Sequence, residues 1–162
     1  MTCIECGTAM KTTRENVKYD AVGLRGVTLQ HIEVRRCPSC GEVEYVIPDI
    51  EGLHRALASA VVLKSAPLSP AEIRFLRTFL GLSGADFARR MGTTAESVSR
   101  WEHGKLPMNP TADRLLRLMV VHEAPVASYA LDSLTQILPK ATTKPLRVGL
   151  TRVKSVWKTI AA

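Results

Sequence analysis

The sequence predicts an α+β protein, with a small β-ribbon module built around four cysteines followed by an all-α module of five helices. Two observations support this prediction. The four cysteines stand in two Cys-x-x-Cys-Gly repeats, and the stretches around them resemble strands. From residue 49 onward, apolar residues recur at helical spacing, and capping residues separate the helical segments. At 162 residues, the chain is long enough for two small modules.

The first module begins with strand-like segments at residues 11–19 and 27–36, joined by a glycine-containing reversal at residues 22–26. A third strand is expected at residues 43–47. Asp49 then has the position of a helix cap, and apolar residues at helical spacing behind it predict a helix that ends near residue 64. Residues 1–64 therefore form the first predicted module.

Residues 65–68 are interpreted as a linker to the second module, residues 69–138. Polar capping residues or a proline at the first helical position indicate where four of its helices begin. These caps are Ser69, Ser83, Thr93 or Thr94, and Asn109. A fifth helix is expected from about residue 126 to residue 138.

The net charge of +7 is concentrated in the C-terminal half of the chain. Basic and acidic residues balance over residues 1–69, whereas residues 139–162 contain six basic and no acidic residues. This distribution favours a polyanionic partner such as DNA, although many basic tails are simply solvated. The composition of the tail at 139–162 favours disorder. An irregular helix with one apolar face is the alternative.

The cysteine repeats have the spacing of a metal site. Two residues between cysteines make a turn that lets both thiolates bind one ion, and the following glycine allows a positive φ. Four thiolates satisfy the tetrahedral preference of zinc and leave no open coordination position. We therefore expect one structural Zn²⁺ per chain, bound by Cys3, Cys6, Cys37 and Cys40.

Two disulfides or four free thiols are the alternatives to the zinc site. The N-terminus has no basic stretch followed by an apolar one, and no apolar run reaches the roughly 20 residues of a membrane span. We therefore expect a cytoplasmic protein, in which close cysteine pairs favour metal over disulfides. A redox role is disfavoured because no βαβ pattern surrounds either pair. His31 is expected on a strand surface, since four sulfurs already complete the coordination shell.

Residues 82–102 have the pattern of a helix-turn-helix. Ala88 is small where two helices cross, Gly92 supplies a left-handed turn four residues later, and Val98 packs the second helix against the first. Phe87 and Trp101 add apolar core. The polar face of the second helix then remains free for the major groove. A generic helical bundle is the alternative.

Arg100 is the first choice for base recognition because a guanidinium can bind both acceptors of guanine, with a phosphate contact as the alternative. Glu96 either accepts from a cytosine amino group or completes a capping box with Thr93, and we favour the box. Ser97 and Ser99 suit phosphate or backbone contacts. The other candidate DNA-contacting residues are Thr94, His103, Lys105, Ser83 and Gly84.

This motif, with its ending Val98-Ser99-Arg100-Trp101-Glu102-His103-Gly104, resembles the Cro/repressor-type (XRE) helix-turn-helix over about residues 68–121. Together with the tetracysteine module, the chain over roughly residues 1–138 looks like the MqsA/YgiT-type antitoxins. The resemblance implies that the four cysteines bind structural zinc, that Ser99 and Arg100 face DNA, and that the C-terminal domain forms a homodimer. It also implies that the N-terminal domain binds a small ribonuclease toxin and that the protein represses its own operon.

Two departures from the family limit this transfer. Family members often carry asparagine where this chain has Glu96, so the operator sequence does not carry over. Many XRE domains have glutamine where this chain has Gly84, so one phosphate contact is missing. The basic tail lies outside the resemblance.

Three functions remain open at this stage. The first is an antitoxin that binds both a toxin and its operator. The second is a stand-alone regulator whose zinc module is structural or senses a ligand. The third, an enzyme, is disfavoured because the cysteines leave no open metal position and no acid–base pair stands near them. We therefore expect no enzymatic activity.

Overall fold

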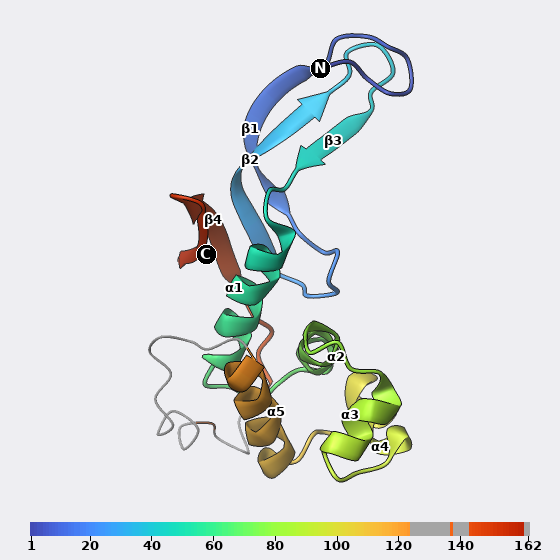
Figure 1. Ribbon diagram of the computed structural model, residues 1–162, viewed down its shortest axis with the longest axis vertical. Helices are drawn as coiled ribbons and strands as arrows, with labels where there is room; N and C mark the ends of the chain where they lie inside the picture. The colour runs from blue at the N-terminus through green and yellow to red at the C-terminus, as the bar shows by residue number, and fades with distance from the viewer. Residues whose placement is uncertain (124–136, 138–142, 161–162) are drawn as a thin grey trace.

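A computed structural model describes residues 1–123, 137 and 143–160 of the chain. These described residues form five helices and five strands in an elongated arrangement. Figure 1 shows the cysteine-bearing loops at one end of the long axis and the helices α2 to α5 at the other. None of the described helices has the length and apolar character needed to cross a bilayer.

The N-terminal strands match the predicted ones closely. They are β1 (Lys11–Lys18), β2 (Val27–Arg36) and β3 (Val43–Val46). Both β1 and β3 pair antiparallel with β2. Alternate residues of β2 are buried, so one face of this central strand packs into the core while the other meets solvent.

The helices also begin where their caps predict. They are α1 (Ile50–Val62), α2 (Pro70–Phe79), α3 (Gly84–Arg90), α4 (Ala95–Glu102) and α5 (Pro110–Glu123). Ser69 forms a complete capping box with Glu72, and Asn109 Oδ1 accepts from the Ala112 amide at 2.8 Å. The expected fifth helix of the second module, at residues 126–138, falls outside the described residues apart from Ile137.

The C-terminal tail corrects the sequence prediction. Residues 148–160 are neither disordered nor helical: they form β4 (Val148–Val153) and β5 (Val156–Ile160), an antiparallel hairpin turned by Lys154 and Ser155. β4 pairs in parallel with β2, matching Val148 to Val27, and so extends the N-terminal sheet. The described part of the predicted second module is therefore helical, and the strands belong to the tail, which joins the sheet of the first module.

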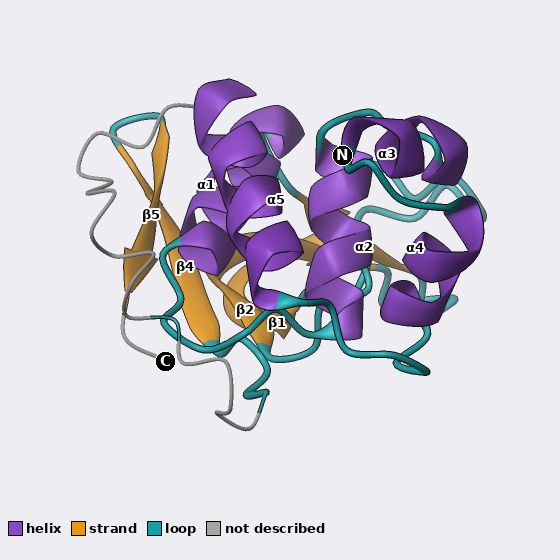
Figure 2. Ribbon diagram, turned by 90° about the horizontal axis from the view of Figure 1, so that it is seen from below, coloured by secondary structure: helices purple, strands orange, loops and turns teal. Residues whose placement is uncertain are grey.

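The hairpin is stable because it completes the core. Val148, Leu150 and Trp157 are buried, and the Trp157 indole donates to the backbone carbonyl of Asp49 at 3.1 Å. Figure 2 shows β4 and β5 at one side of the helices, with α3 and α4 at the other. One continuous apolar core runs from β2 through α1 and α2 to α4 and α5.

The segment between α1 and α2, residues 63–69, is held by a buried ion pair. Arg117 and Asp113 of α5 are 0% and 3% exposed, and Arg117 Nε lies 2.6 Å from Asp113 Oδ1. The guanidinium also donates to the carbonyls of Val62 and Ala66, at 3.0 and 2.8 Å, and to that of Lys64. Asp113 Oδ2 accepts from the amide of Leu68 at 2.8 Å. This segment therefore has one fixed path across α5.

A second carboxylate fixes the same region. Glu72, at 1% exposure, accepts from Lys64 Nζ at 2.6 Å and from the Ser69 amide at 2.7 Å. Its other oxygen accepts from the amide of Leu146 at 3.2 Å, just before β4. The first turn of α2 is therefore hydrogen-bonded both to the segment that precedes it and to the C-terminal hairpin.

We predict that Arg117→Met destabilises the protein by about 3–5 kcal/mol, because it leaves the Asp113 carboxylate buried without its cation and several carbonyls without a donor. Urea denaturation would measure the change in the free energy of unfolding. The matched control is Arg89→Ala, which breaks an exposed i,i+3 pair with Asp86 and should cost about 1 kcal/mol or less. Equal losses for the two variants would contradict the role of the buried pair.

Candidate functional site

The two cysteine repeats fold into equivalent turns. The amide of Gly7 donates to the carbonyl of Cys3 at 2.9 Å, and the amide of Gly41 donates to that of Cys37 at 3.1 Å. Gly7 and Gly41 have φ values of 70° and 79°, a left-handed conformation that residues with a Cβ rarely adopt. The glycine at the end of each repeat therefore permits the positive φ that the sequence predicts for these turns.

The turns bring the four sulfurs together into one cluster. All four Sγ atoms lie within 4.8 Å of one another, with Cys3 and Cys40 at 3.6 Å and Cys6 and Cys37 at 3.3 Å. A tetrahedron with metal–sulfur bonds of about 2.3 Å has sulfur–sulfur edges of about 3.8 Å. The four cysteines are free rather than paired in disulfides. The predicted cluster is confirmed, and it has the geometry to hold a metal ion.

The thiol pKa values also fit a cation site. A hydrogen bond with the Thr8 hydroxyl lowers the pKa of Cys6 to about 6. A hydrogen bond from the Glu42 amide favours the thiolate of Cys40, but the sulfurs of Cys37 and Cys3 outweigh it and raise the pKa of Cys40 to about 12. Closely spaced thiols cannot all ionise beside one another, and a bound cation relieves this repulsion.

The helix-turn-helix has the predicted core. Gly92 has a φ of 63°, so the chain reverses between α3 and α4 as expected. Phe87 and Ala88 of α3 are buried against Val98 and Trp101 of α4. This packing leaves the opposite side of α4 exposed.

The first turns of both helices carry the expected caps. Ser83 Oγ accepts from the Asp86 amide at 3.0 Å, and Gly84 is the first residue of α3. Thr94 Oγ1 accepts from the Ser97 amide at 3.1 Å, so the cap of α4 is Thr94 rather than Thr93. The hydroxyls of Thr94 and Ser97 also lie 3.0 Å apart.

This position of the cap corrects the preferred interpretation of Glu96. With Thr94 as cap, Glu96 is one residue too early to complete a capping box. Its carboxylate instead accepts from Arg100 Nη2 at 2.6 Å, one turn along the helix. The side chains of Arg100 and Glu96 are 55% and 71% exposed, so the pair lies on the free face of α4.

The remaining predicted DNA-contacting residues gather beside Arg100. Ser99 and His103 are exposed, and His103 Nδ1 lies 2.7 Å from the Ser99 carbonyl. His103 Nε2 lies 3.2 Å from Nη2 of Arg74, a cation on α2 that the sequence analysis did not select. Lys105 is exposed in the turn after α4. The free face of α4 thus has cationic groups from two elements.

A second missed interaction fixes the angle between α2 and α4. Glu102, whose side chain is 7% exposed, lies 2.5 Å from Arg77 Nε and 3.5 Å from Arg74 Nε. Arg77 also donates to the carbonyl of Leu82 at 2.7 Å. The amphipathic pattern of α2 offered no signal for this pair, because its partner lies 25 residues away on another helix.

Comparison with protein families supports the assignment of a helix-turn-helix to this part of the chain. Residues 73–122 match the family model described as helix-turn-helix, and this range spans nearly all of α2 through α5. No curated protein matches the chain. The chain thus contains a helix-turn-helix DNA-binding domain. More narrowly, the matched domain is a helix-turn-helix of the XRE type, and the chain also holds a separate cluster of four cysteines.

We predict that treatment with a chelator that strips any bound metal, or mutating Cys40→Ser, loosens the cysteine end of the sheet without unfolding the helices. Amide hydrogen exchange should accelerate over residues 1–15 and 33–47, which are linked through the cluster. It should stay slow at residues 27–29, because β4 pairs with β2 there. Cooperative loss of the entire fold, or unchanged exchange near the cysteines, would contradict this expectation.

Proposed function

We propose that this protein is a sequence-specific transcriptional repressor that reads its operator with α4. The exposure of the face that bears Ser99, Arg100 and His103, opposite the buried Val98 and Trp101, is the observation that carries the proposal. A helix presented in this way by a helix-turn-helix fits the major groove.

The roles follow from the chemistry of each side chain. Arg100 exchanges the Glu96 carboxylate for the two acceptors of a guanine. Glu96, freed from Arg100, is placed to accept from a cytosine amino group. Phosphate contacts come from the hydroxyls of Thr94, Ser97 and Ser99, from His103 and Lys105, and from the α3 start at Ser83 and Gly84. A phosphate contact is the alternative role for Arg100.

We propose a homodimer through the helical part of the chain. A symmetric dimer reads two half-sites about one helical turn apart, roughly 10 base pairs centre to centre. This arrangement would give the operator an approximate palindrome.

The proposed metal is one structural Zn²⁺ per chain, held by the four cysteines. Four thiolates close the tetrahedral shell, so the ion would have no position for substrate or water. We therefore propose no enzymatic activity for the cluster. Instead, the ion would stabilise a segment whose own apolar core is small.

We further propose that the protein is an antitoxin that neutralises a small ribonuclease toxin and represses the operon that encodes both. The order of the tetracysteine module and the XRE-type domain supports this proposal. The sheet at the cysteine end also projects away from α4 (Figure 1), which leaves β1 and β3 accessible while DNA is bound. The alternative is a stand-alone regulator with a structural or sensory zinc module.

A co-purification experiment tests the antitoxin proposal. The product of the adjoining gene is co-expressed with this chain, and the complex is followed by size exclusion and by a ribonuclease assay. An antitoxin binds that product and suppresses its activity. Absence of a complex, with operator binding intact, would favour the stand-alone regulator.

We predict that Arg100→Ala weakens operator binding by about 1–3 kcal/mol and relaxes the preference at one base pair. The physical reason is the loss of a bidentate contact that other side chains of α4 cannot replace. A gel-shift assay on the DNA upstream of the protein's own gene measures this effect.

Two variants serve as controls for Arg100. Arg55→Ala removes an exposed arginine of α1, away from α4, and should leave operator affinity nearly unchanged. Glu96→Gln removes the carboxylate proposed to accept from cytosine, so it should weaken the preference for that base while the guanine preference due to Arg100 remains. Unchanged binding by Arg100→Ala would show that another surface carries recognition.

A further inference from the structure

The β4–β5 hairpin is a purely basic element. Residues 143–160 include Lys144, Arg147, Arg152, Lys154 and Lys158, and no acidic residue. All five side chains belong to exposed residues, and none forms an ion pair within the described part of the chain. Such unneutralised charge favours an anionic ligand.

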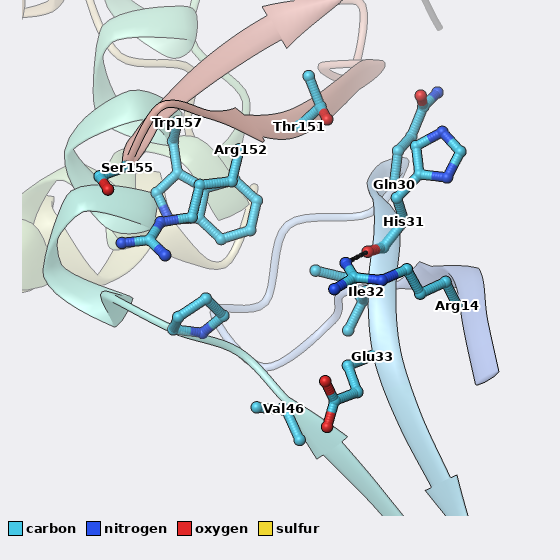
Figure 3. Close-up of a pocket in the computed structure, with 11 residues that line it drawn as sticks. Arg14, Gln30, His31, Ile32, Glu33, Val46, Thr151, Arg152, Ser155 and Trp157 are labelled. Carbon is cyan, nitrogen blue, oxygen red and sulfur yellow. Dashed lines mark hydrogen bonds between the residues drawn. The ribbon is translucent and has the colours of Figure 1, made fainter. Parts of the chain in front are cut away.

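One of these cations faces a cavity of about 290 Å³ between the hairpin and the N-terminal sheet. The cavity arises because β4 pairs with β2 at residues 27–29 and β3 pairs with it at residues 33–36, so residues 30–32 lie between the two partners. Figure 3 shows Arg152 and Trp157 on one side of this space and Arg14 on the other.

The cavity has an excess of positive charge. Arg14 donates to the backbone carbonyl of His31 at 3.3 Å, and Arg152 makes no polar contact with the described residues. The one acid that lines the cavity, Glu33, lies 2.7 Å from Arg35 and is neutralised by it. Two guanidiniums therefore face the cavity without a carboxylate partner.

The walls of the cavity are held in place. His31 has a φ of 55°, and its amide donates to Asn16 Oδ1 at 3.2 Å. Trp157 is anchored by its indole to the carbonyl of Asp49. Ile32 and Val46 also line the cavity. Fixed walls reduce the entropy lost on binding, which is typical of a preformed ligand site.

We propose that this cavity binds a small phosphate monoester. Guanidinium groups form paired, charge-assisted hydrogen bonds with phosphate. A volume near the lower end of ligand sites restricts the ligand to about the size of a mononucleotide. Binding at this site does not depend on the proposed DNA recognition.

The site also has a path to the helix-turn-helix. β4 forms one wall of the cavity, and Leu146, just before β4, is hydrogen-bonded to Glu72 in the first turn of α2. A ligand that draws Arg152 toward Arg14 would pull on β4. The hydrogen bond from Leu146 to Glu72 connects the start of this strand to α2. An effect of the ligand on operator affinity rests on the proposed function, whereas binding itself does not.

The test is a titration of the ¹⁵N-labelled full chain with adenosine 5′-monophosphate, observed by NMR. The chain has two tryptophans, and a saturable shift of the Trp157 indole N–H with an unmoved Trp101 signal is expected. Arg14→Ala and Arg152→Ala should each weaken binding about tenfold or more. Inorganic phosphate should compete on the unmodified protein, which tests the phosphate contact without any variant.

The matched control is Lys158→Ala, which removes one exposed charge from the same hairpin outside the cavity, and it should change binding by less than about twofold. Three results would overturn the proposal. One is the absence of a saturable Trp157 shift, and another is an equal loss in Lys158→Ala, which would indicate diffuse charge. The third is a Trp157 shift produced by adenosine alone, or by duplex DNA of unrelated sequence in place of the monoester.

Discussion

The placement of the sheet relative to the helix-turn-helix depends on the buried pair of Arg117 and Asp113. A charge removed from water costs several kcal/mol unless every donor and acceptor finds a partner. Here the partners are backbone groups from Val62 to Leu68. Because any other path of that segment would leave the charges unsatisfied, the ion pair selects one path. The directions in which α1 enters and α2 leaves are thereby fixed.

Glu72 adds the C-terminal hairpin to the same arrangement. Its carboxylate joins Lys64 and the α2 cap at Ser69 to the amide of Leu146, which is 74 residues from Glu72 in sequence. Two further contacts hold the hairpin in this place. β4 pairs in parallel with β2, and the Trp157 indole is hydrogen-bonded to the residue before α1. The sheet and the helices consequently share one core and one network of buried polar contacts.

Local chemistry explains what the sequence could predict. The caps at Ser69, Ser83 and Asn109 work through bonds to residues three positions away, so they can be recognised from short segments. The cysteine turns are equally local. Glu96 shows the limit of such reasoning, because moving the cap from Thr93 to Thr94 exchanges a capping box for a pair with Arg100.

Contacts between distant segments account for what could not be predicted. Val148 pairs with Val27, and nothing in the tail alone identifies that partner. Asp113 and Arg117 resemble an ordinary exposed i,i+4 pair on an amphipathic helix, and only the segment that crosses α5 buries them. The cavity next to Arg152 depends on the hairpin, so it could not be predicted from the sequence either. Tertiary context, rather than local propensity, decides each of these features.

The separation of surfaces has a consequence for regulation. The cysteine end of the sheet and the free face of α4 lie at different ends of the molecule (Figure 1), so a partner on the first need not displace DNA from the second. A partner changes DNA affinity only by its differential affinity for two arrangements of the protein. The buried contacts of Arg117 and Glu72, together with the shared apolar core, connect the sheet to the helices, so a partner that alters operator binding from the sheet would act through these contacts. The first turn of α2, which carries Glu72, is then one element through which regulation would pass.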